Sequence, residues 1–179
     1  MIISKQISLI NTQEKRQVLI DAFEENKHLV KTDKFGFEYL SSFDLPEKYD
    51  DKTIHISDAI IGLSEYLKLF QPTKSGMSLK YIQVRKQSVD MQKPWGNEMP
   101  WNRLDIHIPL NKTTGGNYHF QHATISNKLG SALMFDPLND YWSVDKVESP
   151  HYKVILRFSD LDPALDYTGK GDLINFPEV

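Results

Sequence analysis

The stretch Leu104-Asp-Ile-His-Ile-Pro-Leu110 decides the fold, because apolar residues stand at every second position. A period of two is typical of a β-strand with one apolar face. The same period runs through the residues from Met77 to Phe158, in short segments separated by turn residues. The expected strands are Leu79–Lys86, Leu104–Leu110, Asn117–Ile125, Ser131–Phe135, Tyr141–Val147 and Lys153–Phe158. Closely spaced strands of this kind predict an antiparallel barrel or sandwich.

The residues before this region have helical spacing instead. After a short strand expected at Ile2–Ile10, Asn11 or Thr12 is placed to cap a helix, with Glu14 reaching back to Asn11 in a capping box. The apolar face of this helix consists of Val18, Leu19, Ala22 and Phe23. The helix is expected to continue to about Val30.

A loop and a second helix are expected next. The loop spans roughly Lys31–Lys52 and carries aromatic anchors, Phe35, Phe37, Tyr39 and Phe43. Ser57 or Asp58 can cap the second helix, which ends at the proline and glycine of 71–76. Its apolar face consists of Ile60, Leu63, Leu67 and Phe70.

The chain of 179 residues is expected to form one domain over 1–179. Its fold class is mainly β: a jelly-roll barrel, or double-stranded β-helix, with two flanking helices at the N-terminal side. Residues 1–76 form the helical flank, 77–160 the barrel core and 161–179 a C-terminal wrap rich in proline and glycine.

Composition excludes several functional classes. The formal net charge of −3, with lysines dispersed, favours neither a nucleic-acid nor an anionic-membrane partner. The absence of cysteine excludes disulfides, thiolate metal sites and a cysteine nucleophile. No long apolar segment is present, so a cytoplasmic location is the expectation. The sequence does not indicate an oligomeric state.

Four strand motifs carry a resemblance to a known family. They are Arg103-Leu-Asp-Ile-His-Ile-Pro-Leu-Asn111, Gly130-Ser-Ala-Leu-Met-Phe-Asp136, Trp142-Ser-Val-Asp-Lys-Val147 and Lys153-Val-Ile-Leu-Arg-Phe-Ser-Asp160. In order and spacing they resemble the aspartyl/asparaginyl β-hydroxylase branch of the Fe(II)- and 2-oxoglutarate-dependent oxygenases. The resemblance covers roughly Leu79–Asp160 and implies a double-stranded β-helix, with Fe(II) and 2-oxoglutarate as cofactors of an active hydroxylase.

The resemblance places metal ligands at positions where this chain has other residues. The distal iron-binding histidine corresponds to Trp142, whose indole nitrogen can only donate a hydrogen bond. The proximal His-x-Asp motif is best matched by Ser88-Val-Asp90, with serine in place of the imidazole. The arginine that binds 2-oxoglutarate corresponds to Lys153. The resemblance therefore implies a degenerate iron site.

A displaced ligand set is the alternative. Asp105 and His107 lie two apart on one strand and so share a face, and His151 could complete a set with them. Asp90 is the other available carboxylate. The remaining candidate imidazoles are His119 and His122, three apart, which face opposite sides of a regular strand unless a bulge intervenes.

The final strand supplies a possible anion site. Lys153 and Arg157 share one face and must reach solvent, pair with carboxylates such as Asp105 or Asp90, or bind an anion. Together with His107 they are the residues expected to hold a 2-oxoglutarate-like anion.

Three functions remain open on the sequence. The first is an oxygenase-like barrel that has lost its iron site and binds a ligand without catalysis. The second is an active oxygenase or cupin-type metalloenzyme with the displaced ligands, and the third is a structural or assembly jelly roll. Residues 91–101 form a long inter-strand loop that could serve as a lid or as a plug over a vacated site.

Overall fold

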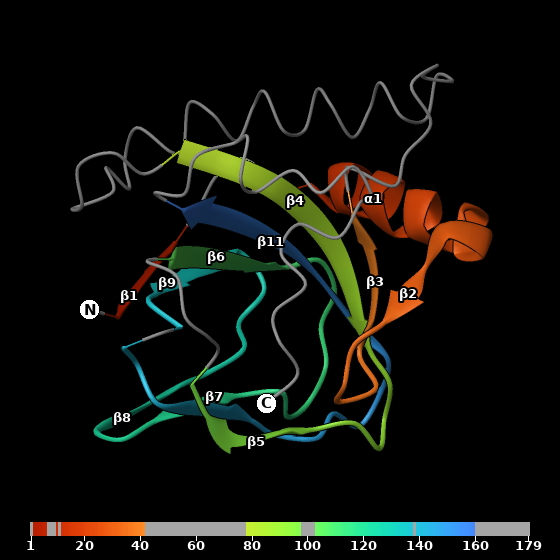
Figure 1. The fold of residues 1–179 in the computed structure, drawn as a ribbon. Helices are drawn as coiled ribbons and strands as arrows, with labels where there is room; N and C mark the ends of the chain where they lie inside the picture. The colour runs from red at the N-terminus through yellow and green to blue at the C-terminus, as the bar shows by residue number, and fades with distance from the viewer. Residues whose placement is uncertain are drawn as a thin grey trace.

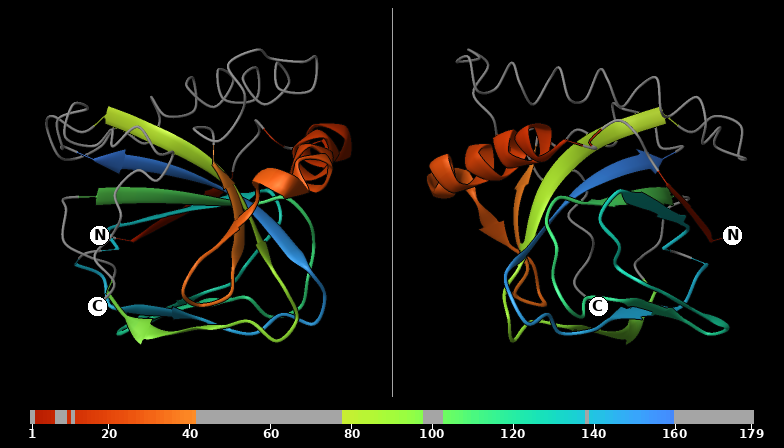
Figure 2. Two further views of the ribbon diagram at one scale, coloured as in Figure 1. Left: turned by 45° about the vertical axis from the view of Figure 1, so that its right-hand side comes forward. Right: turned by 180° about the vertical axis from the view of Figure 1, so that it is seen from behind.

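Two antiparallel β-sheets face each other, and one helix covers the outer side of the larger sheet (Figures 1 and 2). The computed structural model describes residues 2–6, 10, 12–41, 78–97, 103–137 and 139–159. From β4 to β11 the chain passes back and forth between the two sheets, with the β7–β8 hairpin within the smaller one, which is the winding of a double-stranded β-helix. The mainly β jelly-roll architecture predicted from the sequence is therefore confirmed.

The larger sheet has seven strands in the order β1-β9-β6-β11-β4-β3-β2. Their bounds are β1 Ile3–Gln6, β9 Ser131–Phe135, β6 Arg103–Pro109, β11 His151–Ser159, β4 Ser78–Gln87, β3 Glu38–Ser41 and β2 Lys31–Thr32. The smaller sheet has the order β5-β10-β7-β8. Its strands are β5 Lys93–Gly96, β10 Trp142–Val144, β7 Tyr118–Phe120 and β8 Ala123–Ile125.

The N-terminal flank is less helical than predicted. Strand β1 and the hairpin of β2 and β3 extend both edges of the larger sheet, so the aromatic segment expected as a loop is partly strand. The described residues contain one α-helix, α1 at Gln13–Glu25, followed by a 3₁₀-helix, η1 at Lys27–Leu29. The second helix predicted from Ser57, and the wrap at 161–179, lie outside the described residues.

Helix α1 begins at Thr12, one of the two predicted caps. The Thr12 hydroxyl oxygen accepts a hydrogen bond from the backbone amide of Lys15 at 3.3 Å. With Thr12 as the cap, the third helical position is Lys15, so Glu14 stands one residue too early for a capping box. The capping-box prediction is therefore wrong.

Strand β6 divides its side chains between two cores. Leu104, Ile106 and Ile108 point toward α1 and join a buried cluster that includes Leu19 and Phe23 of the helix. Asp105 and His107 point the other way, between the sheets, and are also buried. A second apolar cluster lies on that inner side: Tyr118, Phe120, Leu133, Phe135, Trp142 and Val144. The strand period thus places the polar side chains inside the barrel.

Two strand predictions require correction. Residues 117–125 form a hairpin of β7 and β8, because Phe120 pairs with Ala123 across a tight turn at Gln121 and His122. The segment 91–101, expected as a loop, contains strand β5, whose Pro94 and Gly96 are poor strand formers. Proline is tolerated there because β5 lies at the edge of its sheet.

A polar cluster fastens α1 to the larger sheet. Glu24 of the helix accepts hydrogen bonds from Lys86 Nζ at 3.1 Å and from Tyr152 Oη at 2.5 Å. Lys27 Nζ also lies 2.5 Å from this carboxylate. Burial raises the pKa of Glu24, but these hydrogen bonds outweigh it and lower the pKa from 4.5 to about 2. The carboxylate is therefore held in its charged form.

We expect Glu24→Gln to lower the free energy of unfolding by about 1–3 kcal/mol, because hydrogen bonds to a charged group contribute more than neutral ones. Urea denaturation at pH 7 measures the effect. Glu148→Gln, at an exposed carboxylate, is the matched control. Equal stability of the two variants would show that the cluster contributes nothing.

Candidate functional site

The two central strands of the larger sheet carry charged side chains into the barrel. Asp105 and His107 come from β6, and Lys153 and Arg157 come from β11, which pairs with it directly. All four side chains are buried, between 1% and 4% exposed. Buried charges require partners, and the contacts of these residues define the site.

Asp105 and Arg157 form a bidentate ion pair across the two strands. Arg157 Nε donates to Asp105 Oδ1 at 2.9 Å, and Nη2 donates to Oδ2 at 2.8 Å. The two residues are register partners in the β6–β11 ladder. Of the alternatives left open for Arg157, pairing with a carboxylate is the one that the structure shows, and it engages both oxygens of Asp105. Arg157 is thereby committed to a carboxylate of its own chain, not to an external anion.

Lys153, Tyr118 and His107 form a chain of hydrogen bonds on the same inner surface. Lys153 Nζ donates to Tyr118 Oη at 2.9 Å, and the same oxygen lies 2.6 Å from His107 Nδ1. An ammonium can only donate, so the tyrosine hydroxyl proton is available to His107 Nδ1. The His107 ring then carries its own proton on Nε2.

His107 is neutral at physiological pH. Burial lowers its pKa from 6.5 to about 4, against the opposing effect of Asp105. Its Nε2 lies 3.7 Å from Asp105 Oδ2, which is too far for a hydrogen bond. Among the described residues, the buried His107 Nε2 and Trp142 Nε1 have no hydrogen-bond partner. The interior thus offers polar groups that a ligand or water could satisfy.

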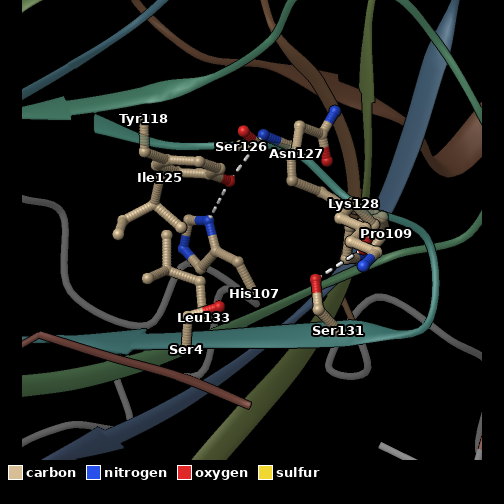
Figure 3. Close-up of a pocket in the computed structure, with 11 residues that line it drawn as sticks. Ser4, His107, Pro109, Tyr118, Ile125, Ser126, Asn127, Lys128, Ser131 and Leu133 are labelled. Atoms are coloured by element: carbon tan, nitrogen blue, oxygen red, sulfur yellow. Dashed lines mark hydrogen bonds between the residues drawn. The ribbon is translucent and has the colours of Figure 1, made fainter. Parts of the chain in front are cut away.

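A small pocket opens onto the hydrogen-bond chain of Lys153, Tyr118 and His107 (Figure 3). His107, Tyr118 and Lys153 are among the residues that line it, together with Lys128 of the turn before β9 and Ser131, the first residue of β9. Figure 3 shows the His107 and Tyr118 rings pointing toward each other beneath Ser126 and Asn127. The cavity has a volume of about 10 Å³, roughly the space of one water molecule.

His119 and His122 lie apart from this site, whereas His151 borders it through Asn127. His119 Nε2 is 2.6 Å from Asp145 Oδ1 on a partly exposed surface, and His122 is exposed in the β7–β8 turn. His151 is buried against Asn127, whose Nδ2 lies 3.1 Å from His151 Nε2. Burial, with a contribution from the charge of Lys153, lowers the pKa of His151 from 6.5 to about 3.

The structure corrects the match proposed for the proximal metal motif. Ser88 and Asp90 lie in the turn after β4, with Asp90 exposed. His107 and Trp142, in contrast, meet inside the barrel, with ring centroids 6.1 Å apart. The strand beside Trp142 is β5, where Gly96 pairs with Trp142. The strand that lies next to Trp142 is therefore β5, and not the turn that contains Ser88 and Asp90.

The described residues do not fit an iron site of two imidazoles and one carboxylate. No group of three or more histidine, aspartate or glutamate side chains in the described part of the chain is close enough to hold a metal ion. Asp105 is engaged by Arg157, and the residue that the sequence resemblance matched to the distal ligand is the buried Trp142, whose indole has no lone pair for a metal. Lys93 Nζ lies 4.0 Å from the centre of that indole, so a cation already occupies its face.

Two residues of the site were not identified from the sequence. Tyr118 is in the middle of the hydrogen-bond chain. The one sequence signal that could have identified it is its place in an alternating strand. Lys93 was assigned to a loop, and a lysine is ordinarily an exposed residue.

In the described residues, no helix is long and apolar enough to cross a membrane.

Comparison with solved structures identifies the fold. The chain is similar to a viral collagen prolyl hydroxylase from Paramecium bursaria Chlorella virus-1, solved with 2-oxoglutarate, with a TM-score of 0.63 and 14% identity over 89% of this chain and 96% of that one. A prolyl-4-hydroxylase from Pseudomonas putida gives a TM-score of 0.68 at 8% identity, over 89% and 93% of the two chains.

A third similar structure has a different reaction. The 2-oxoglutarate-dependent epimerase SnoN of nogalamycin biosynthesis matches with a TM-score of 0.62 and 13% identity, over 98% of this chain and 89% of that one. No family model and no curated protein matches the sequence. The chain therefore has the fold of the Fe(II)/2-oxoglutarate oxygenases, and similarity at this level of identity establishes the fold alone.

Proposed function

We propose that this protein is a non-catalytic member of the oxygenase fold that binds a small carboxylate inside its barrel. The observation that carries the proposal is the buried chain Lys153–Tyr118–His107, which opens onto a pocket. The strand motifs favour the aspartyl/asparaginyl hydroxylase type. The Trp142 indole and the engaged Asp105 carboxylate support the loss of the iron site.

The hydrogen-bond chain of Lys153, Tyr118 and His107 has donors that suit a carboxylate ligand. The Lys153 ammonium supplies positive charge and the Tyr118 hydroxyl supplies a second donor, and the two groups are already 2.9 Å apart. Charge-assisted hydrogen bonds to a carboxylate are among the strongest available to a protein. A bound carboxylate oxygen would accept from both groups. Because the Tyr118 hydroxyl has a single proton, His107 would then change tautomer, carry its proton on Nδ1 and donate it to the tyrosine oxygen.

The size of the cavity sets a condition on binding. The space of about one water molecule is too small for a keto acid. Lys128 and Ser131 belong to a single turn at the pocket, closed by a hydrogen bond from Ser131 to the Lys128 carbonyl. We infer that this turn moves outward when a ligand enters, so that the carboxylate replaces water beside Lys153.

We expect 2-oxoglutarate or succinate to raise the melting temperature of the native protein, because a ligand that binds only the folded state stabilises it. Lys153→Met should abolish this shift, since it removes the charge and keeps most of the side-chain volume. Differential scanning fluorimetry across a ligand series measures both effects.

Two further variants sharpen the test. Tyr118→Phe keeps the ring and should weaken binding without abolishing it, whereas Lys112→Met, at an exposed lysine, should bind as the native protein does. If neither dicarboxylate shifts the melting temperature, or if Lys153→Met shifts as much as the native protein, the proposed pocket is wrong.

A further inference from the structure

Lys93 places a buried ammonium group between β5, an edge strand of the smaller sheet, and its neighbour β10. The residue belongs to edge strand β5 and is 4% exposed. Its Nζ donates to the carbonyl oxygens of Pro94 at 3.2 Å, Gly96 at 3.1 Å and Trp142 at 3.1 Å. An ammonium has three donors, and three carbonyl oxygens are arranged to receive them.

An aromatic surface completes the environment of this ammonium. Nζ lies 4.0 Å from the centre of the Trp142 ring and 5.7 Å from that of Phe35. The face of an indole is the best aromatic partner of a cation. Oxygen atoms and a π face thus surround the charge, as ligands surround a bound ion.

The irregular pairing of β5 with β10 explains why an ammonium group stabilises this part of the smaller sheet. Within the described residues two register pairs join the strands, Trp142 with Gly96 and Val144 with Lys93, and the register shifts between them. The ammonium binds carbonyls of both strands at this irregularity. It therefore supplies the cross-strand attraction that regular ladder hydrogen bonds supply elsewhere.

We propose that the carbonyl oxygens of Pro94, Gly96 and Trp142, with the indole face, form a cation site whose permanent occupant is the ammonium of Lys93. The site adjoins Trp142, the residue at the position of the distal metal ligand in the family resemblance. The barrel thus holds an organic cation, attached to its own chain, beside the position of that ligand. A vacated site should accept a small alkylammonium ion.

Chemical rescue tests this proposal. Lys93→Ala removes a fragment equivalent to n-propylammonium and should lower the melting temperature. Adding n-propylammonium chloride at millimolar concentration should restore part of the loss in a saturable manner. The neutral 1-propanol, of similar size, should not, and neither probe should stabilise the native protein or Lys112→Ala.

Lys93→Met separates charge from volume, because it fills the space without a cation and leaves no room for the probe. It should be destabilised and remain insensitive to n-propylammonium. Equal rescue of Lys93→Ala by 1-propanol, or no rescue by either probe, would overturn the cation site and leave Lys93 as a packing residue.

A measurement on the native protein stands independently of how the variants fold. In a ¹H–¹⁵N correlation spectrum of lysine ammonium groups, the buried Lys93 group should give a slowly exchanging signal shifted upfield by the Trp142 ring. The conservative Trp142→Leu variant should remove the upfield shift. An ammonium signal for Lys93 that exchanges as fast as that of exposed Lys112 would contradict the proposal.

Discussion

Replacing Asp105 with alanine is expected to lower the free energy of unfolding by about 3–5 kcal/mol, the usual consequence of removing one partner of a buried ion pair. Arg157 is about 4% exposed and cannot reach water without moving out of the β6–β11 ladder. Its Nε and Nη2 groups each donate a hydrogen bond to the carboxylate that the substitution removes. Urea denaturation at pH 7 measures the difference.

The matched controls distinguish a lost partner from a lost packing contact. The double variant Asp105→Leu/Arg157→Met removes both charges and should recover most of the stability, since apolar residues of similar volume often replace a buried ion pair at little cost. Lys27→Ala breaks an ion pair whose lysine is 61% exposed and should cost less than about 1 kcal/mol. A single Asp105 variant no less stable than Lys27→Ala would contradict the buried pair.

Acid is expected to destabilise the protein well before its carboxylates titrate. Burial lowers the pKa of His107 to about 4 and that of His151 to about 3. An unfolded histidine titrates near pH 6.5, so between pH 6.5 and 4 the unfolded chain binds more protons than the folded one. Stability must then fall as the pH falls, by up to about 1.4 kcal/mol per pH unit for each histidine.

The two histidines together should remove roughly 3 kcal/mol between pH 6.5 and pH 5. Denaturation curves taken in steps of half a pH unit measure the slope, and the range above pH 5 avoids Glu24, whose contribution is lost only between about pH 4.5 and 2. His107→Gln and His151→Gln should each reduce the slope by about half. The exposed His122→Gln should not change it. A flat profile over this range would show that neither imidazole is held neutral.

The alternation of β6 is the part of the site that the sequence predicted best. Because a strand exposes alternate residues to one side, Asp105 and His107 had to share a face, and they do so inside the barrel. The same rule placed Lys153 and Arg157 together. It could not show that Arg157 pairs with Asp105 while Lys153 pairs with Tyr118, because these choices depend on the register between strands.

The smaller sheet was harder to predict because its edge strand lacks the usual signals. Strand β5 contains Pro94 and Gly96, and its buried side chain is a lysine. Periodicity alone therefore indicated a loop, and the proximal metal motif was matched to Ser88 and Asp90 in the preceding turn. Trp142, which the resemblance matched to the distal metal ligand, lies at the start of β10 and is buried in the inner apolar cluster.

The most direct test of a carboxylate site without a metal ion is isothermal titration of 2-oxoglutarate into chelator-treated protein, with and without added Fe(II) under anaerobic conditions. We expect saturable binding of 2-oxoglutarate with the same Kd in both titrations, and no binding to the Lys153→Met variant. Binding that appears only when Fe(II) is present, and that His107→Ala abolishes, would contradict it and indicate a metal-dependent oxygenase.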